Sequence, residues 1–223
     1  MSKEAEDGGL FQSLLKDFLK VAYLLSVEKK TFTVEDFSSK LDRTIEEGKA
    51  LLSVLTGMNL IKRVVKPPNH FMITQGGKNN LRIVLTGGVF DIIHLGHIKT
   101  LKAAKENGNV LIVVDASDEM VESTKGRPPL NSQVNRMKLL EELTIVDITA
   151  KGSPDPSKFL ETVIDYEPNV IALGYDQSST EAMLERELEK SNINNIEIKK
   201  LDIQVPNEKS SLKYKNLDQH SFE

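Results

Sequence analysis

Two histidines, His94 and His97, stand three residues apart at the end of the glycine-flanked string 86–97. Side chains three apart on a helical turn point to one side, so both imidazoles can donate hydrogen bonds to one group. Just upstream, Gly87 and Gly88 let the backbone come close to an anion. Unpaired amides at the start of a following helix would add donors. This arrangement indicates a polyphosphate-binding site.

The same histidine spacing has two alternative interpretations, a metal-binding pair and two ordinary surface residues. The chain contains only four histidines, and no third ligand lies near His94 and His97 to complete a zinc site. There is no cysteine, which excludes disulfides, thiolate metal sites and thiol nucleophiles. Phosphate binding is the interpretation that this context favours.

A strand must end just before the histidines and a helix must begin at them. From residue 81 on, short apolar runs alternate with helical stretches, at 81–86, 96–105, 110–115, 132–143, 170–173, 180–190 and 196–201. Such alternation predicts an open α/β domain, a parallel sheet of the Rossmann-like type with ligands bound beyond the carboxyl ends of its strands. The chain after Gln204 is polar and weakly patterned.

The first 77 residues have a different pattern. Apolar residues recur at helical spacing over 10–26, and Thr33 and Thr44 each begin a capping signature followed by a shorter helix. Two β-rich runs, 60–65 and 70–74, flank a proline turn and predict a hairpin. Three helices and a hairpin resemble a winged helix-turn-helix domain. We therefore expect two domains, 1–77 and 78–223, with the glycine-rich stretch from Gln75 at the boundary.

The string 86–97 matches the HxGH signature of the cytidylyltransferase-like nucleotidyltransferases, together with the Gly-x-Phe-Asp that precedes it. The resemblance implies that His94 and His97 hold the triphosphate and stabilise the transition state at the α-phosphorus. It also implies that a phosphate oxygen of the substrate attacks, with Mg²⁺ or another divalent cation present. Nucleotide binding is then expected of Gly87, Gly88, Val89, Phe90 and Asp91.

Further strings resemble the family's later motifs. Asp118, after the second strand, is expected to help fix the nucleotide, with a helix N-cap as its alternative. Lys125, Arg127 and Arg136 are candidate cations for the phosphates, and Arg136 is the favoured one. Taken singly, each of these basic residues could instead be a solvated surface charge.

Two strings nearer the C-terminus are similar to base-binding and triphosphate-binding motifs of the family. Asp176 and Gln177 follow the buried-looking run at 170–173 and are expected to face the nucleotide. Ser210 and Ser211 resemble a reduced form of the C-terminal serine motif. A flexible polar tail is the alternative there.

Within the family, the strings look most like those of the archaeal FAD synthases. That resemblance implies transfer of AMP from ATP to FMN, giving FAD and pyrophosphate. One alternative is a cytidylyltransferase that uses CTP with glycerol 3-phosphate or phosphoethanolamine. Another alternative is a ligand-sensing regulator that binds DNA. The chain has no tryptophan, so an isoalloxazine ring would pack on Phe, Tyr or aliphatic side chains.

DNA binding is the less favoured alternative. A recognition helix offers basic or amide side chains to the bases, whereas the third predicted helix begins with Glu46 and Glu47. Lys62, Arg63 and Lys66 form the only obvious basic patch, and the formal net charge is -4. No leader or membrane-spanning run is recognised, so we expect a cytoplasmic protein without membrane contact, assembled as a homodimer.

Overall fold

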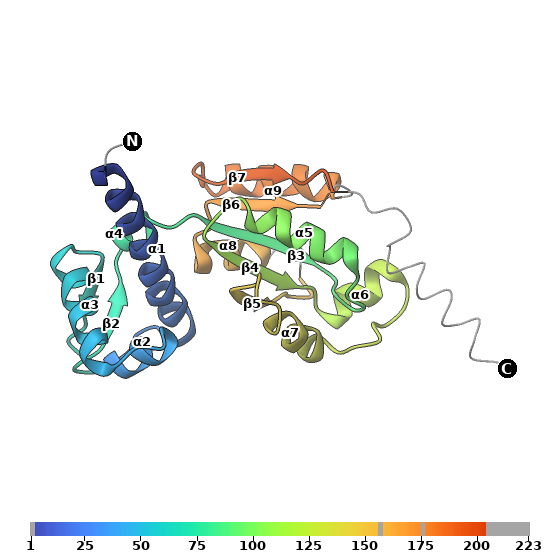
Figure 1. Cartoon of the computed structure of the whole chain (residues 1–223). Helices are drawn as coiled ribbons and strands as arrows, with labels where there is room; N and C mark the ends of the chain where they lie inside the picture. The colour runs from blue at the N-terminus through green and yellow to red at the C-terminus, as the bar shows by residue number, and fades with distance from the viewer. Residues whose placement is uncertain (1–2, 156–157, 175–176, 204–223) are drawn as a thin grey trace. The chain divides into compact units, whose positions relative to one another are not determined.

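The computed structural model describes residues 3–155, 158–174 and 177–203. The chain divides into two compact units, residues 1–82 and 83–223 (Figure 1). The boundary lies five residues after the predicted one because the glycine-rich stretch is a packed helical turn, α4 (Gln75–Lys78). A Cβ on Gly77 would lie 2.1 Å from the Leu60 carbonyl oxygen, so α4 is part of the first unit.

The first unit begins with three helices, α1 (Lys3–Lys29), α2 (Val34–Lys40) and α3 (Ile45–Gly57). Both predicted capping signatures form. The Thr33 hydroxyl accepts from the Asp36 amide while the Asp36 carboxylate accepts from the Thr33 amide, and Thr44 pairs with Glu47 in the same way. Each reciprocal pair satisfies two amides that the first helical turn leaves open, which fixes where α2 and α3 start.

A short antiparallel hairpin follows, β1 (Ile61–Arg63) paired with β2 (Phe71–Ile73). Phe71 also forms an isolated bridge with Phe32, whose ring stacks on Phe37 and Phe71 at centroid distances of 5.9 and 6.2 Å. These three buried rings join the helices to the hairpin. The order of elements is the one that the sequence predicts for this unit.

The second unit is built on a parallel sheet of five strands. The strands are β3 (Ile83–Gly88), β4 (Val110–Asp115), β5 (Ile148–Lys151), β6 (Val170–Leu173) and β7 (Glu197–Lys200). The three central strands consist mainly of buried apolar residues, as expected where helices cover both faces of a parallel sheet. The predicted α/β fold with an open parallel sheet is confirmed.

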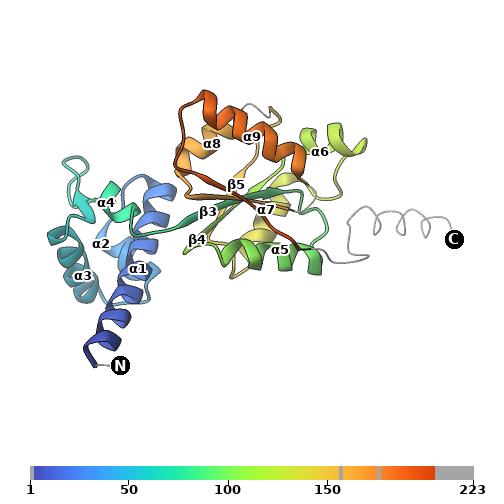
Figure 2. The same ribbon diagram turned by 90° about the horizontal axis from the view of Figure 1, so that it is seen from above.

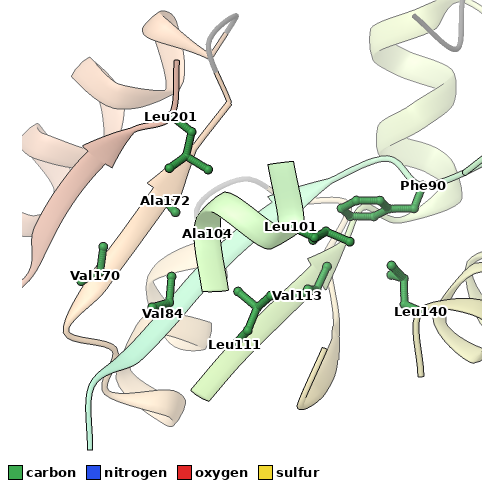
Figure 3. Close-up of a cluster of buried hydrophobic side chains, with 10 residues drawn as sticks. All are labelled: Val84, Phe90, Leu101, Ala104, Leu111, Val113, Leu140, Val170, Ala172 and Leu201. Atoms are coloured by element: carbon green, nitrogen blue, oxygen red, sulfur yellow. The ribbon is translucent and has the colours of Figure 1, made fainter. Parts of the chain in front are cut away.

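Helices cover the two faces of the sheet. They are α5 (Leu95–Lys105), α6 (Asp118–Lys125), α7 (Gln133–Glu141), α8 (Phe159–Tyr166) and α9 (Ser178–Lys190). Leu101 of α5 and Leu140 of α7 pack with buried strand residues in one apolar cluster (Figure 3). Figure 2 shows α8 and α9 on the face opposite to α5.

The strand order β5-β4-β3-β6-β7 sets the position of the ligand crevice. The chain moves outward from β3 through β4 to β5, then returns to place β6 on the other side of β3. Connections leave β3 and β6 in opposite directions, and this switch point is where open α/β sheets bind ligands, beyond the carboxyl ends of the strands. The buried Thr86 hydroxyl donates to the Ala172 carbonyl across this pair of strands, at 2.8 Å.

Candidate nucleotide-binding site

The predicted histidine pair lies at the carboxyl end of β3. His94 is the N-cap of α5, and its Nδ1 accepts a hydrogen bond from the Gly96 amide at 3.1 Å. Because Nδ1 is an acceptor, the proton of the neutral ring lies on Nε2, which becomes the donor. The His97 ring stacks on the His94 ring with centroids 3.9 Å apart and planes inclined by 26°. The two imidazoles and the first amides of α5 therefore form one cluster of donors at a helix N-terminus.

The Phe90 ring packs against the His97 ring, and Gly88 leaves room for the Phe90 ring. The Phe90 ring is buried, and its centroid lies 5.1 Å from that of His97. A Cβ on Gly88 would lie 3.0 Å from the Phe90 ring, whereas one on Gly87 would meet only ordinary contacts, the nearest at 3.6 Å. Gly88 is therefore the glycine whose missing side chain lets the Phe90 ring reach its place.

Asp91 is buried and anchors a loop. Its carboxylate accepts from the Leu130 amide at 2.9 Å and from the Asn131 amide at 2.8 Å. The Asn131 side chain returns a hydrogen bond to the Asp91 carbonyl at 2.7 Å. The turn that leads to the histidines is thus tied to the loop of residues 126–131.

Arg136, the favoured candidate cation, is held by acceptors of the protein itself. Its side chain is fully buried and donates from Nε to Asp115 at 3.1 Å and from Nη1 to Asp118 at 2.7 Å. It also donates to the carbonyls of Asn131 and Ala116. The described contacts of this guanidinium are thus with two carboxylates and two backbone carbonyls. The alternative of a solvated surface charge does not hold.

Asp118 is not the helix N-cap that the sequence offered as its alternative place. The N-cap of α6 is Ser117, whose hydroxyl accepts from the Met120 amide at 3.1 Å. Asp118 is the first helical residue, and its Oδ1 accepts from Arg136 and from the Gln133 amide at 2.9 Å. Its carboxylate therefore links α6 to the start of α7.

Burial and pairing shift the pKa values of both members of the ion pair, Asp115 and Arg136. Burial raises the pKa of Asp115 to about 6, against the lowering effect of the Arg136 guanidinium. Burial lowers the pKa of Arg136, but hydrogen bonds to Asp118 and Asp115 outweigh it and the net shift is upward. The guanidinium is therefore charged at all physiological pH values, while Asp115 titrates within reach of them.

Lys125 and Arg127 flank Gly126, the C-cap residue of α6. Gly126 adopts the left-handed conformation, with φ 69°, and its amide donates to the Glu122 carbonyl. The Lys125 side chain is exposed overall, yet its pKa is lowered, first because nearby protein atoms displace water and second because Arg127 is close. The two cations thus lie near each other, at the start of the loop that Asp91 and Arg136 hold.

Gln177 lies at the carboxyl end of β6, on the other side of the switch point. It is the N-cap of α9, and its Oε1 accepts from the Gly174 amide at 2.8 Å. This hydrogen bond joins the start of α9 to the residue that follows β6. Asp176, Ser210 and Ser211 lie outside the described residues.

Asp115, Asn131 and Gln133 are not among the predicted site residues. Asp115 ends the apolar run at 110–114, and a charged residue directly after a buried strand is the signal that could have identified it. Gln133 is buried and donates to the carbonyls of Asp115 and Gly152 at 2.8 and 3.1 Å. No sequence signal distinguishes it, because its partners are brought together only when the ends of β4 and β5 lie side by side in the folded sheet.

The described residues contain no group of three or more His, Cys, Asp or Glu side chains able to hold a metal ion. The buried carboxylates of Asp91 and Asp115 already accept protein hydrogen bonds. Mg²⁺ prefers oxygen ligands and commonly binds through substrate phosphates with few protein ligands. The described side chains therefore do not form a dedicated magnesium cage. Within the same residues, no helix is long and apolar enough to cross a membrane.

The fold and the site define a nucleotidyltransferase. The chain belongs to the cytidylyltransferase-like family, whose model matches residues 85–216. This range begins within β3 and includes every predicted site residue. The first unit lies outside it.

Curated relatives include archaeal proteins named FAD synthase. The one from Thermococcus sibiricus is 48% identical over 117 residues, which cover 52% of this chain and 78% of the relative. The one from Thermoplasma volcanium is 38% identical over 137 residues, or 60% of this chain and 94% of the relative. A solved structure, described as a lipopolysaccharide core biosynthesis protein from Thermoplasma volcanium, is 36% identical. It has a TM-score of 0.51 and covers 56% of this chain and 99% of its own.

Proposed function

We propose that this chain transfers AMP from ATP to the phosphate of FMN, giving FAD and pyrophosphate. The observation that carries the proposal is the stacked pair of His94 and His97 at the N-terminus of α5, with Nε2 of His94 as a donor. Similarity to archaeal proteins named FAD synthase supports ATP and FMN as the two substrates.

The reaction needs no nucleophile from the protein. A phosphate oxygen of FMN attacks the α-phosphorus of ATP and forms a new P–O bond. The bond between the α-phosphorus and its bridging oxygen breaks, and pyrophosphate leaves with the electron pair. Catalysis is then a matter of orienting the two phosphates and stabilising the negative charge that grows on the phosphoryl oxygens.

The donor cluster at α5 suits this task. Its imidazoles and backbone amides are fixed by the fold before the nucleotide arrives, so little reorganisation is needed when charge develops. Imidazole N–H donors and a helix N-terminus both favour anions over neutral groups. We assign His94 and His97 to the triphosphate, with Gly87, Gly88 and Val89 as the backbone that approaches it.

Two further groups are assigned by their position. Lys125, at the end of α6, and Arg127, on the loop tied to Asp91, are the cations we expect at the leaving pyrophosphate. Mg²⁺, which supplies charge neutralisation when bound, would be held mainly by the substrate's own phosphate oxygens. Gln177 shapes the turn after β6 and so borders the nucleotide from the other side of the switch point.

Pyrophosphate release by the purified protein tests the proposal. ATP and CTP are each paired with FMN, glycerol 3-phosphate and phosphoethanolamine in the presence of Mg²⁺. Release with ATP and FMN, accompanied by FAD, is the expected result. Release only in the presence of CTP would replace the proposal with a cytidylyltransferase. If no pairing releases pyrophosphate, both the FAD synthase and the cytidylyltransferase assignments are wrong.

A further inference from the structure

Four segments of the second unit meet at the buried side chain of Arg136. Its Nε lies 3.1 and 3.3 Å from the two carboxylate oxygens of Asp115, at the end of β4. Its Nη1 donates at 2.7 Å both to Asp118 at the start of α6 and to the Asn131 carbonyl at the end of the loop. Its Nη2 donates to the Ala116 carbonyl. The side chains of Arg136 and Asp115 are both 0% exposed.

Further hydrogen bonds connect the partners of Arg136 to Asp91, in the turn that leads to His94 and His97. Asn131, whose carbonyl accepts from Arg136, donates from its amide to Asp91 Oδ1 and from its side chain to the Asp91 carbonyl. Leu130 donates its amide to the other carboxylate oxygen of Asp91. Asp91 precedes His94 by three residues. An unbroken path of hydrogen bonds therefore joins Asp115 to the segment that carries the histidines.

The same set of hydrogen bonds reaches β5 through Gln133. Its amide donates to Asp118, and its side chain donates to the carbonyls of Asp115 and Gly152. The carboxyl ends of β4 and β5 are thereby fixed to the start of α7. Together with the Asp91 contacts, the carboxyl ends of three neighbouring strands share one network.

Stability alone does not account for an ion pair in this position. Removing two charges from water is costly, and apolar residues of similar volume often replace a buried pair without loss of stability. A guanidinium, however, presents five donors in a rigid planar fork, so it can fix several acceptors in one geometry. Two of the acceptors held by Arg136 are backbone carbonyls, that of Ala116 between β4 and α6 and that of Asn131 at the end of the loop.

We propose that Asp115 and Arg136 are positioning residues that hold the loop of residues 126–131 at a fixed distance from the histidine turn. Through this loop they set where Lys125 and Arg127 stand relative to the triphosphate. The inference rests on the proposed function, because these two cations act on the phosphates of the nucleotide. Neither positioning residue touches the substrate.

Three variants test the proposal: Asp115→Asn, Arg136→Met and the two combined. Each single substitution leaves one buried charge without its main partner, which destabilises the fold. The double variant removes both charges at nearly constant volume and is expected to unfold at a higher temperature than either single variant. Its kcat with ATP and FMN is nevertheless expected to stay at least tenfold below that of the wild type, with the KM for ATP changed by less than about threefold.

Amide hydrogen exchange at Leu130 and Asn131 supplies a readout that needs no substrate. In the double variant, both amides are expected to exchange at least tenfold faster than in the wild type, because Asn131 has lost its contact to the guanidinium. A double variant whose kcat recovers together with its stability, or whose two amides remain as protected as in the wild type, would overturn the proposal.

A matched control removes an ion pair elsewhere in the same unit. Lys105→Met breaks the contact with Asp147, between α5 and the segment before β5, and leaves the Arg136 network in place. This variant is expected to keep the kcat and the exchange rates of the wild type. If the wild type forms no FAD, the proposed function fails, whereas the exchange rates still decide whether Asp115 and Arg136 hold the loop.

Discussion

The ring of Phe90 lies against that of His97, with centroids 5.1 Å apart and planes inclined by 57°. Phe90 belongs to the apolar cluster between the sheet and α5, whereas His97 belongs to the donor cluster at the N-terminus of the same helix (Figure 3). The packing of the core therefore determines the position of the His97 ring.

Replacing His97 by alanine is expected to lower turnover about 100- to 1000-fold, because loss of one preorganised donor costs roughly 2.7–4 kcal/mol of barrier. The side chain is half-buried, so the free energy of unfolding should change little. Steady-state kinetics and urea unfolding of the same preparation measure both. His70→Ala in the first unit is the control, expected to retain full turnover. A His97→Ala enzyme with most of its activity would refute the assigned role.

Phe90→Leu keeps an apolar side chain but removes the flat ring that supports His97. We expect a destabilisation of about 1–2 kcal/mol and a fall in kcat of roughly tenfold or more, because small displacements of a catalytic group are costly. Phe37→Leu, at a fully buried position of the first unit, is the matched control. It should lose similar stability in thermal unfolding without the loss in kcat. Equal kinetic effects in both variants would contradict a specific support for His97.

The titration of Asp115 is a third prediction. Since burial raises its pKa from 3.8 to about 6, the folded chain holds this proton more tightly than the unfolded chain. The stabilisation from this group is complete below about pH 4 and is lost as the pH rises through 6, an effect of about 3 kcal/mol. Relative to Asp115→Asn, the wild type should therefore lose stability between pH 4.5 and 7.

Carbon NMR of the Asp115 carboxyl, assigned by its disappearance in Asp115→Asn, measures the pKa directly. Denaturant unfolding of both proteins across the same pH range measures the linked stability. A carboxyl that titrates at or below 3.8, with a stability difference that is independent of pH above 4.5, would show that the Arg136 charge outweighs burial.

Gly152 packs against the backbone that carries Asp115. A Cβ at this position would lie 2.6 Å from the Asp115 carbonyl oxygen, which cannot move without disturbing the Gln133 contact. Gly152→Ala is expected to destabilise the second unit by about 1–3 kcal/mol in urea unfolding. Gly57→Ala, where no atom lies within 4 Å, should be neutral or slightly stabilising. A neutral Gly152→Ala variant would show that the strand ends are free to shift.

Local signals made much of this site predictable. Glycines before the histidines and alternating apolar runs are encoded over a few residues, and they correctly predicted the turn between β3 and α5 and the parallel sheet. The capping signatures at Thr33 and Thr44 likewise gave the starts of α2 and α3. In each capping signature the two partners are three residues apart, so the pattern can be recognised locally.

Other features depend on partners distant in sequence. The burial of Arg136 and its ion pair with Asp115 were not predicted, because Asp115 lies 21 residues earlier, at a strand end that only the folded sheet brings near. The strand β5 was not predicted, because the segment Ile148–Lys151 is short and carries few apolar residues. Its pairing comes from the register with β4. Such long-range contacts leave no local pattern to identify.

The most direct test of the proposed reaction is phosphorus NMR of the wild-type protein incubated with ATP, FMN and Mg²⁺. The expected result is the appearance of FAD and pyrophosphate in equal amounts as ATP and FMN decline together, with both products suppressed at least 100-fold in His97→Ala. Release of ADP and orthophosphate instead, or consumption of ATP with FMN left unchanged, would contradict attack of the FMN phosphate on the α-phosphorus.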